Sequence, residues 1–247
     1  MRPFLKTWVD AGLSFFYPEV CQVCTQERAS VEECYVCGSC REDVEFIAEP
    51  FCQRCGMPCE GDVSTSFLCS DCREMTCYFS YARAAVAARG VVLDIIHRYK
   101  YSSAMWFEPF LASLLAQRAG PVLREQGWDM IIPVPLHPSR EAERGFNQAE
   151  RLARPLSKLT GIPLQTTRVL RRTRPTETQT RLSQTERAAN VNRAFAVRKR
   201  GLVEGKRLVL VDDVRTTGAT TNACAKVLLA AGAKEVCVWT VARALLE

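Results

Sequence analysis

Apolar residues in this chain fall either into short continuous runs or into longer stretches with the spacing of a helix face. Short runs are typical of buried strands, and they occur near residues 128–134, 168–171, 207–212 and 235–242. Stretches with helical spacing separate them, such as 147–159 and 219–232. Because strands and helices alternate, the pattern predicts an α/β fold in which helices flank a parallel sheet. Ligands of such folds bind at the carboxyl ends of the strands.

Helical spacing also occurs before the first of these strands. Apolar residues recur over 4–16 and stop before Pro18, which predicts a helix docked on the rest of the chain. A membrane-surface anchor is the alternative, but interfacial helices are usually richer in basic residues. A second helix is expected to contain Val86 together with the apolar residues of 91–96, and a third to span 106–118.

A polar sequence of unusual composition follows the run that ends near residue 212. It holds two adjacent acids and then a threonine-rich turn: Asp212, Asp213, Thr216, Thr217, Gly218, Ala219 and Thr220. Backbone N–H groups at such a turn, and at the start of the helix after it, attract phosphate. The two carboxylates can accept hydrogen bonds from ribose hydroxyls, directly or through Mg²⁺. The sequence therefore predicts a sugar-phosphate site.

This stretch resembles the phosphoribosyl pyrophosphate (PRPP) signature of the type I phosphoribosyltransferases, and it matches that signature in full. The alternative is an ordinary strand–turn–helix unit, which gives no packing reason for paired acids at this place. The resemblance implies a type I phosphoribosyltransferase-like parallel sheet. It also implies that the turn from Thr216 to Thr220 binds the 5-phosphate, and that Asp212 and Asp213 are the catalytic pair that holds the ribose hydroxyls.

A basic stretch follows the first of the predicted strands and repeats this logic. Asn147 is expected to cap the next helix, with Glu150 as its reciprocal partner. A strand followed by a basic loop and a helix start is a second anion site. We expect Leu136, Arg140 and Arg144 to hold the pyrophosphate together with Mg²⁺. A solvated basic turn is the alternative.

Residues 171–187 are polar apart from Leu182 and cannot build a core. A long polar insertion within a compact domain is usually a functional lid or disordered. We expect Arg172, Arg174 and Arg181 to belong to a lid that excludes water from the site. The wider stretch 168–200 carries ten basic and two acidic residues, which would also suit a nucleic-acid backbone or simply be solvated.

The thirteen cysteines are distributed unevenly, because eleven of them lie between Cys21 and Cys77. The N-terminus lacks the continuous apolar core of a signal peptide, so a disulfide framework is not expected. The break in cysteine content predicts two domains. Residues 1–77 would form an N-terminal helix and a zinc-knuckle region, and residues 78–247 a phosphoribosyltransferase-like domain.

Two similar blocks of cysteines make up the zinc-knuckle region. Each block pairs two Cys-x-x-Cys motifs at a spacing that suits tetrahedral Zn²⁺. Either one or two structural zinc sites fit this pattern, and ligand sets that interleave between the blocks stay open. Cys34 is a competing ligand in the first block, whereas Cys59 and Cys77 are expected to be packed thiols. The expected ligands are Cys21, Cys24, Cys37 and Cys40 in the first block and Cys52, Cys55, Cys69 and Cys72 in the second.

Charge and hydropathy add two expectations. Lys and Arg outnumber Asp and Glu by 33 to 27, and the formal net charge of +6 suits phosphate-bearing ligands and permits nucleic acid. No apolar run is long enough to span a bilayer. We therefore expect a cytoplasmic protein without a membrane span.

Taken together, these motifs resemble the ComF/GntX (ComFC) family of bacterial competence-associated proteins. The resemblance covers nearly the whole chain and rests on the zinc knuckles, the PRPP signature and further segments at 99–101, 133–137, 144–148 and 179–190. It implies a zinc-binding N-terminal region, a phosphoribosyltransferase domain, and a role in DNA uptake or in the use of DNA as a nutrient. It also implies that Lys100 is a further phosphate contact and that a DNA-uptake helicase is a partner.

Three functions follow as hypotheses. The first is Mg²⁺-dependent phosphoribosyl transfer from PRPP to an acceptor that the sequence does not identify. The second is single-stranded DNA binding within an uptake machinery, with PRPP as a ligand or regulator. The third is a scaffold whose zinc knuckles dock a partner, and the intact signature argues against it.

Overall fold

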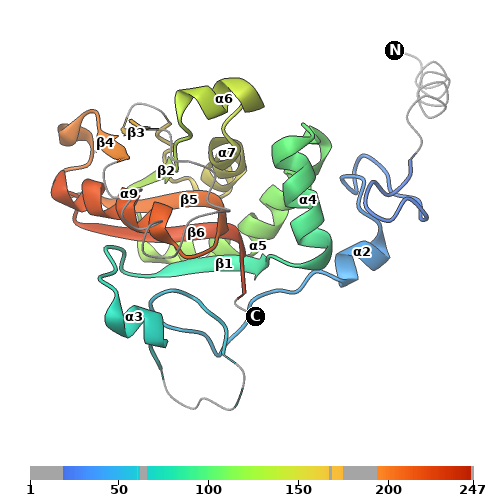
Figure 1. Ribbon diagram of the computed structural model, residues 1–247, viewed down its shortest axis with the longest axis horizontal. Coiled ribbons are helices and arrows are strands. Elements are labelled where there is room, and N and C mark those ends of the chain that lie inside the picture. The colour runs from blue at the N-terminus through green and yellow to red at the C-terminus, as the bar shows by residue number, and fades with distance from the viewer. Residues whose placement is uncertain (1–18, 60, 62–65, 167–168, 175–193, 246–247) are drawn as a thin grey trace.

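The structure is a computed structural model of the chain, in which residues 19–59, 61, 66–166, 169–174 and 194–245 are described. The helix expected over 4–16 lies outside these residues, as does most of the polar stretch 171–187. A parallel sheet with helices on both faces forms the centre of the molecule, and the cysteine-rich segments lie at its periphery (Figure 1).

Four strands form the central sheet in the order β1-β6-β5-β2, and all of its pairings are parallel. Their bounds are β1 Ala82–Ala87, β2 Met130–Pro133, β5 Arg207–Arg215 and β6 Glu235–Arg243. Because parallel strands point the same way, the carboxyl ends of β5, β6 and β2 meet at one edge. The register sets Asp212 opposite Thr240, and Pro133 opposite Val211.

Strand β5 is buried on both faces, as expected for a parallel sheet covered by helices. Val209 and Val211 belong to one core cluster, and Leu208 and Leu210 belong to the other, because successive side chains of a strand point to opposite faces. Helices α4 Gly90–Tyr101, α5 Glu108–Gln126 and α7 Gln148–Thr160 contribute to the first cluster, and α9 Ala219–Ala230 contributes to the second.

Two expectations about the strands are wrong. Val86 lies in strand β1 rather than in a helix, and helix α4 begins only at Gly90. The predicted strand near 168–171 does not join the central sheet: β3 Leu170–Arg172 pairs antiparallel with β4 Phe195–Val197 in a separate two-stranded sheet. β1 escaped prediction because four of its six residues are alanine, which has low strand propensity.

The remaining predicted helices agree with the structure in kind. The stretch expected over 106–118 is a 3-10 turn, η1 Met105–Phe107, followed by the longer α5. The Asn147 side chain caps α7 as predicted, since it accepts the N–H groups of Ala149 at 3.0 Å and Glu150 at 3.4 Å. Glu150 pairs instead with Arg154, one turn further along the same helix. The basic stretch before this cap, expected as a loop, forms a short helix, α6 Pro138–Arg144.

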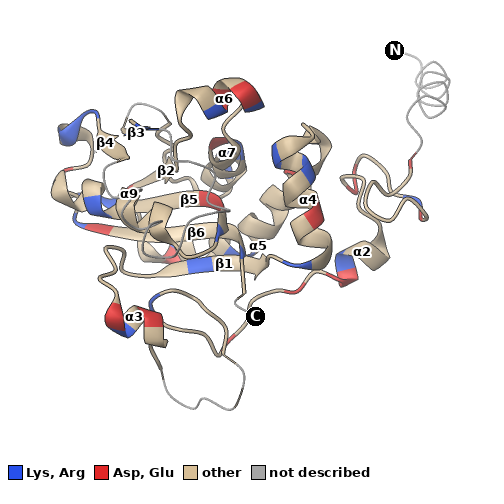
Figure 2. Ribbon diagram, viewed as in Figure 1, with Lys and Arg blue, Asp and Glu red and all other residues tan. Residues whose placement is uncertain are grey.

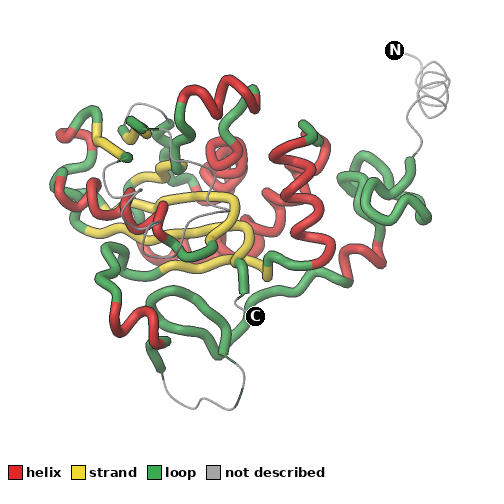
Figure 3. Tube along the Cα trace, viewed as in Figure 1, coloured by secondary structure: helices red, strands yellow, loops and turns green. Residues whose placement is uncertain are grey.

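The two cysteine blocks are mostly irregular chain, each with one short helix, α2 Gly38–Glu42 or α3 Ser70–Glu74 (Figure 3). A further 3-10 turn, η3 Arg200–Leu202, precedes β5. The first block packs on α4 and α5, where Arg98 donates to the Gln22 carbonyl and the Arg41 guanidinium lies 5.0 Å from the Phe110 ring centroid. The second block lies beside β1, α9 and the end of β6 (Figure 1). Over the described ranges, the helices are too short or too polar to cross a lipid bilayer.

Candidate PRPP site and zinc centres

The two signature acids end the central strand β5. Asp212 is 8% exposed and Asp213 is 3% exposed. Each carboxylate accepts the next backbone N–H group, from Asp213 at 2.9 Å and from Val214 at 2.7 Å. The Lys100 ammonium, at the end of α4, lies 2.6 Å from Oδ2 of Asp213. The structure thus brings the predicted phosphate contact Lys100 directly onto the predicted ribose-binding pair.

Burial sets the electrostatics of this pair. Removal from water raises the pKa of Asp212 well above its usual value, and the adjacent Asp213 charge raises it further, whereas the Lys100 charge opposes the shift. Two carboxylates share one nearby ammonium, so the cluster has room for more positive charge. A Mg²⁺ ion carried by a ligand would supply it.

The threonine turn follows at once and opens helix α9. Gly218 is the N-cap of α9 and has a φ of 80°, a left-handed conformation that favours glycine. A Cβ atom at this position would lie 2.3 Å from the Arg215 guanidinium, so a side chain also has no space. Within the described part of the chain, the backbone N–H groups of Thr216, Thr217 and Gly218 donate no hydrogen bond. These donors are available to an anion at the start of a helix.

Helices α4 and α6 both carry basic residues in their last turns (Figure 2). His137 caps α6 through Nδ1, and Leu136 just before it is half-buried. Arg140 lies 3.3 Å from Glu143 on the same helix. Arg144 donates to Gln148 at 2.5 Å, and its guanidinium lies 5.5 Å from the centroid of the Tyr101 ring. Because Tyr101 is next to Lys100, this contact joins the predicted pyrophosphate helix to the acid pair.

The predicted lid arginines separate in the structure. Arg172 lies in strand β3, and burial lowers its pKa. The charge of Asp212 opposes this shift and that of Arg140 adds to it, so the three groups interact electrostatically. Its guanidinium lies 5.5 Å from the Phe195 ring. Arg174 is exposed just after β3, and Arg181 lies outside the described residues.

Two arginines at this edge were missed by the sequence reasoning. Arg215 and Arg243 end β5 and β6, pair with each other in the strand register, and are 5% and 4% exposed. An arginine directly after a buried run is visible in the sequence. Its burial is not, because burial here depends on the second cysteine block.

The eight predicted zinc ligands form two separate sets. Within each set the four Sγ atoms lie within 4.8 Å of one another. The Cys24–Cys37 and Cys55–Cys69 sulfur distances are 3.7 and 3.6 Å, close to the sulfur–sulfur spacing of about 3.8 Å that Zn–S bonds of about 2.3 Å give in a tetrahedron. The sets do not interleave. They are Cys21, Cys24, Cys37 and Cys40, and Cys52, Cys55, Cys69 and Cys72.

The thiols of each set differ in how readily they ionise in the absence of metal, because burial raises the pKa of Cys37 and that of Cys69 to about 11. Burial opposes ionisation of Cys21, but backbone N–H groups, first that of Cys37, outweigh it and lower the pKa to about 6. The same balance lowers the pKa of Cys52 to about 7. Thiolates are the form that binds Zn²⁺. Cys34 is not part of the first set, since its sulfur faces the Glu32 carbonyl at 3.9 Å. These are two four-cysteine zinc ribbon sites.

Two family models match separate parts of the chain. Residues 12–74 match the double zinc ribbon domain family, and residues 125–245 match the phosphoribosyl transferase domain family. A solved purine phosphoribosyltransferase from Pyrococcus horikoshii shares 21% identity over 54% of this chain and 83% of that chain, with a TM-score of 0.34.

Full-length relatives are also found. Competence protein F of Haemophilus influenzae is 30% identical over 85% of this chain and 90% of its own length. The DNA utilization protein YhgH of Escherichia coli K12 is 30% identical over 92% of this chain and 98% of its own length. Competence protein ComFC of Streptococcus pneumoniae is 29% identical over 84% and 87%. The chain therefore belongs to the ComF/YhgH family, whose members join a double zinc ribbon to a phosphoribosyltransferase domain.

Proposed function

We propose that this protein binds PRPP as its Mg²⁺ complex and transfers the phosphoribosyl group to an acceptor. The observation that carries the proposal is the junction of the buried Asp212–Asp213 pair, the Lys100 ammonium and a helix-opening turn with open N–H donors. No packing role accounts for two adjacent buried carboxylates with one cation beside them.

In this proposal each part of the site holds one part of PRPP. The N–H groups and hydroxyls from Thr216 to Thr220 bind the 5-phosphate. Asp212 and Asp213 accept from the ribose hydroxyls. Arg140 and Arg144, at the edge where β2 ends, bind the pyrophosphate with the chain after Leu136.

Lys100 has a part in exchanging these charges. In the free protein its ammonium compensates Asp213 at 2.6 Å. Mg²⁺ and the ribose hydroxyls would give the carboxylates other partners, and Lys100 would then be free to turn to the pyrophosphate. The C1–O bond then breaks with both electrons leaving on pyrophosphate, and the ribose passes through an oxocarbenium-like state before the acceptor bonds to C1. The protein contributes positioning and charge stabilisation. Arg172, in β3, and Arg174, just after it, contribute positive charge from that strand.

Single-stranded DNA binding, with PRPP as a ligand or regulator, is a second candidate. The relatives are named as competence and DNA utilization proteins. At the end of α4 and in the following turn η1, Tyr101 is 61% exposed and Trp106 is 41% exposed. With Arg144 stacked over Tyr101, such aromatic and basic side chains can stack bases and contact phosphates. On either function we place the protein in the cytoplasm, where zinc thiolates stay reduced.

Titration of the full-length zinc-loaded protein with PRPP·Mg²⁺ by calorimetry tests the proposal. We expect Asp212→Asn and Asp213→Asn each to weaken PRPP binding by roughly 10–100-fold, since each removes one charged hydrogen-bond acceptor. Asp129→Asn, an exposed carboxylate at the opposite end of β5, is the matched control. Unchanged PRPP affinity in both signature variants would show that the site is elsewhere.

A second arm separates transfer from binding. Pyrophosphate release from PRPP is measured with a panel of bases, nucleotides and DNA ends as acceptors. Release with one of them identifies a transferase. Tight PRPP binding without release, together with oligonucleotide affinity that falls steeply with salt, favours the DNA-binding function.

A further inference from the structure

A pair of buried arginines lies between the PRPP turn and the second zinc ribbon. Arg215 and Arg243 lie opposite each other in the register at the ends of β5 and β6. Both are at least nine-tenths buried, yet neither forms an ion pair with a carboxylate of the described residues. A buried guanidinium without a counter-charge is costly. These two cations therefore call for a nearby anion.

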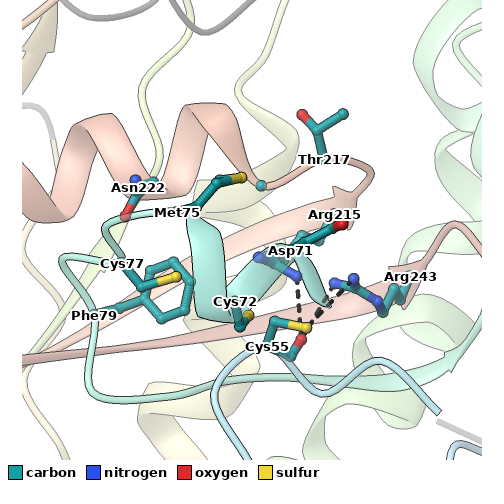
Figure 4. Close-up of a pocket in the computed structure, with 11 residues that line it drawn as sticks. Cys55, Asp71, Cys72, Met75, Cys77, Phe79, Arg215, Thr217, Asn222 and Arg243 are labelled. Atoms are coloured by element: carbon teal, nitrogen blue, oxygen red, sulfur yellow. Dashed lines mark hydrogen bonds between the residues drawn. The ribbon is translucent and has the colours of Figure 1, made fainter. Parts of the chain in front are cut away.

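The contacts of both side chains lead to one zinc ligand (Figure 4). Nη1 of Arg215 donates to the carbonyl oxygen of Cys55 at 3.1 Å, and Nη1 of Arg243 donates to the same oxygen at 3.2 Å. Nη2 of Arg243 points at Sγ of Cys55, 3.7 Å away. Guanidinium groups thus hold both the backbone and the sulfur of this ligand.

The charge of a loaded zinc centre supplies the missing anion. Four thiolates around one Zn²⁺ leave an excess of two negative charges. Two buried guanidinium ions beside the second set balance that excess, and a hydrogen bond to a ligating sulfur is the usual way in which an outer partner fixes a metal ligand. The first set differs, because no arginine donates to its sulfurs within the described residues.

The other side of Arg215 lies against the phosphate turn. Its guanidinium occupies the space next to Gly218, where a Cβ atom would come within 2.3 Å of it. Its Nε has no hydrogen-bond partner among the described residues, so one buried donor is left beside the turn. Asn222, in the first turns of α9, accepts the Tyr78 N–H at 2.7 Å and donates to the Thr76 carbonyl at 3.0 Å, which ties the same helix to the chain leaving the ribbon.

We infer that the second zinc centre, through Arg215 and Arg243, sets the conformation of the phosphate-binding turn, so that zinc occupancy and PRPP affinity are coupled. The two arginines are positioning residues in this arrangement. The inference rests on the proposed function for its PRPP half, while its zinc half rests on the charge balance alone. Coupling between the affinities of two ligands is reciprocal, so bound PRPP should also raise the zinc affinity of this centre and leave less of it open to a chelator.

The test challenges the zinc-loaded, full-length protein with a chelator and follows alkylation of individual cysteines by peptide mass spectrometry. In Arg243→Gln we expect the second set to be alkylated about tenfold faster or more, as for loss of other outer partners of metal ligands, with the first set unchanged. PRPP·Mg²⁺ should slow alkylation of the second set in the unmodified protein but not in the variant. The second set is Cys52, Cys55, Cys69 and Cys72.

Arg83→Gln is the matched control. Arg83 also holds the second ribbon, through the Gln53 carbonyl at 3.1 Å, and its charge acts on Cys52 and Cys55, but within the described residues it donates no hydrogen bond to Cys55 or to the turn. We expect its alkylation rates and PRPP affinity to stay near those of the unmodified protein. Arg243→Lys keeps the positive charge and has a milder effect on folding. Its second-set alkylation rate should lie between those of the unmodified protein and Arg243→Gln.

Two results overturn the inference. The first is that the second set is alkylated at the same rate in Arg243→Gln as in the unmodified protein. The second is that Arg83→Gln accelerates alkylation as much as Arg243→Gln does, which would mean that either variant only loosens the contact between the ribbon and the sheet. If the unmodified protein binds no PRPP, the proposed function fails instead. The chelator comparison then still decides whether the arginines stabilise the second centre.

Discussion

At the scale of single residues, the site stores unfavourable charge that a ligand can relieve. Asp212 is buried beside a second carboxylate, and the single Lys100 ammonium, paired with Asp213, is the nearby positive charge that acts on both. Natural binding sites often hold such destabilising groups because function requires them. The ligand-free protein should therefore gain stability when the uncompensated charge is removed.

Asp212→Asn tests this at the residue scale. An aspartate with a raised pKa holds its proton more tightly in the folded state, so the free energy of unfolding falls as pH rises above the ordinary value of 3.8. Asparagine has no charge to bury. We expect the variant to gain about 1 kcal/mol near neutral pH, or roughly 2–4 °C in Tm, and the gain to shrink towards about pH 4.

Thermal denaturation of the ligand-free protein across this pH range measures the effect. Asp129→Asn serves again as the exposed control, because its carboxylate accepts the Arg207 N–H and has a lowered pKa, which predicts a loss of stability in place of a gain. A Tm difference for Asp212→Asn that does not vary with pH would contradict the account of a buried charge.

At the scale of elements, the predicted phosphate turn depends on one glycine, which allows both a left-handed backbone conformation and the close packing of an arginine. Gly218 has a left-handed φ of 80° and touches Arg215 where a side chain would stand. Both constraints act on the first turn of α9, whose N–H groups form the predicted anion site. A change here should alter the turn more than the sheet beneath it.

Gly218→Ala is expected to weaken PRPP binding about tenfold or more and to destabilise the chain by roughly 1–3 kcal/mol, the usual cost of a strained backbone position. Calorimetric titration and denaturant unfolding measure the two effects. Gly201→Ala is the control, because an added Cβ there meets no atom within 4 Å. Equal PRPP affinity in Gly218→Ala and the control would show that the turn does not bind the phosphate.

The same scale shows how far the sequence predicted the fold. β5 and β6 were predictable because their apolar runs are long and clear, and the Asn147 cap followed from its side chain. β1 was not, since its alanines are shared by helices and strands. The strand at β3 was recognised, but its sheet depends on β4, a partner more than twenty residues away with no pattern of its own.

The site divides along the same line. The acids, the turn and the zinc ligands are local motifs, and local motifs can be read from spacing. Lys100 and Asp213 pair although they are 113 residues apart in the sequence, and Arg215 contacts Cys55 across 160 residues. Contacts at such separation are set by how whole elements pack, which no local pattern records.

At the scale of the whole molecule, the zinc ribbons are parts of the core and not appendages. Cys21, Cys37 and Cys40 belong to the same buried cluster as Tyr99 of α4 and Phe110 of α5. The second ribbon is hydrogen-bonded to β1 and β6. Loss of zinc should therefore also destabilise the transferase-like part of the chain.

We expect calorimetry of the zinc-loaded protein to show one cooperative unfolding transition. Chelation of the zinc should lower the Tm by about 10 °C or more, because structural zinc sites contribute directly to folding free energy. A chelator saturated with Zn²⁺ beforehand is the control. Two separate transitions, of which only one responds to chelation, would indicate that the ribbons fold independently of the sheet.

The placement of Cys55 has a consequence for how this protein can be divided. A fragment that begins at residue 78 retains every element of the PRPP signature, but it lacks the carbonyl and sulfur that hold Arg215 and Arg243. Water would reach two cations that the intact chain keeps dry, and the turn beside them would lose its backing. On the proposed function, the smallest unit that binds PRPP should therefore be larger than residues 78–247 and include the second cysteine block, because contacts of Cys55 cross the predicted division.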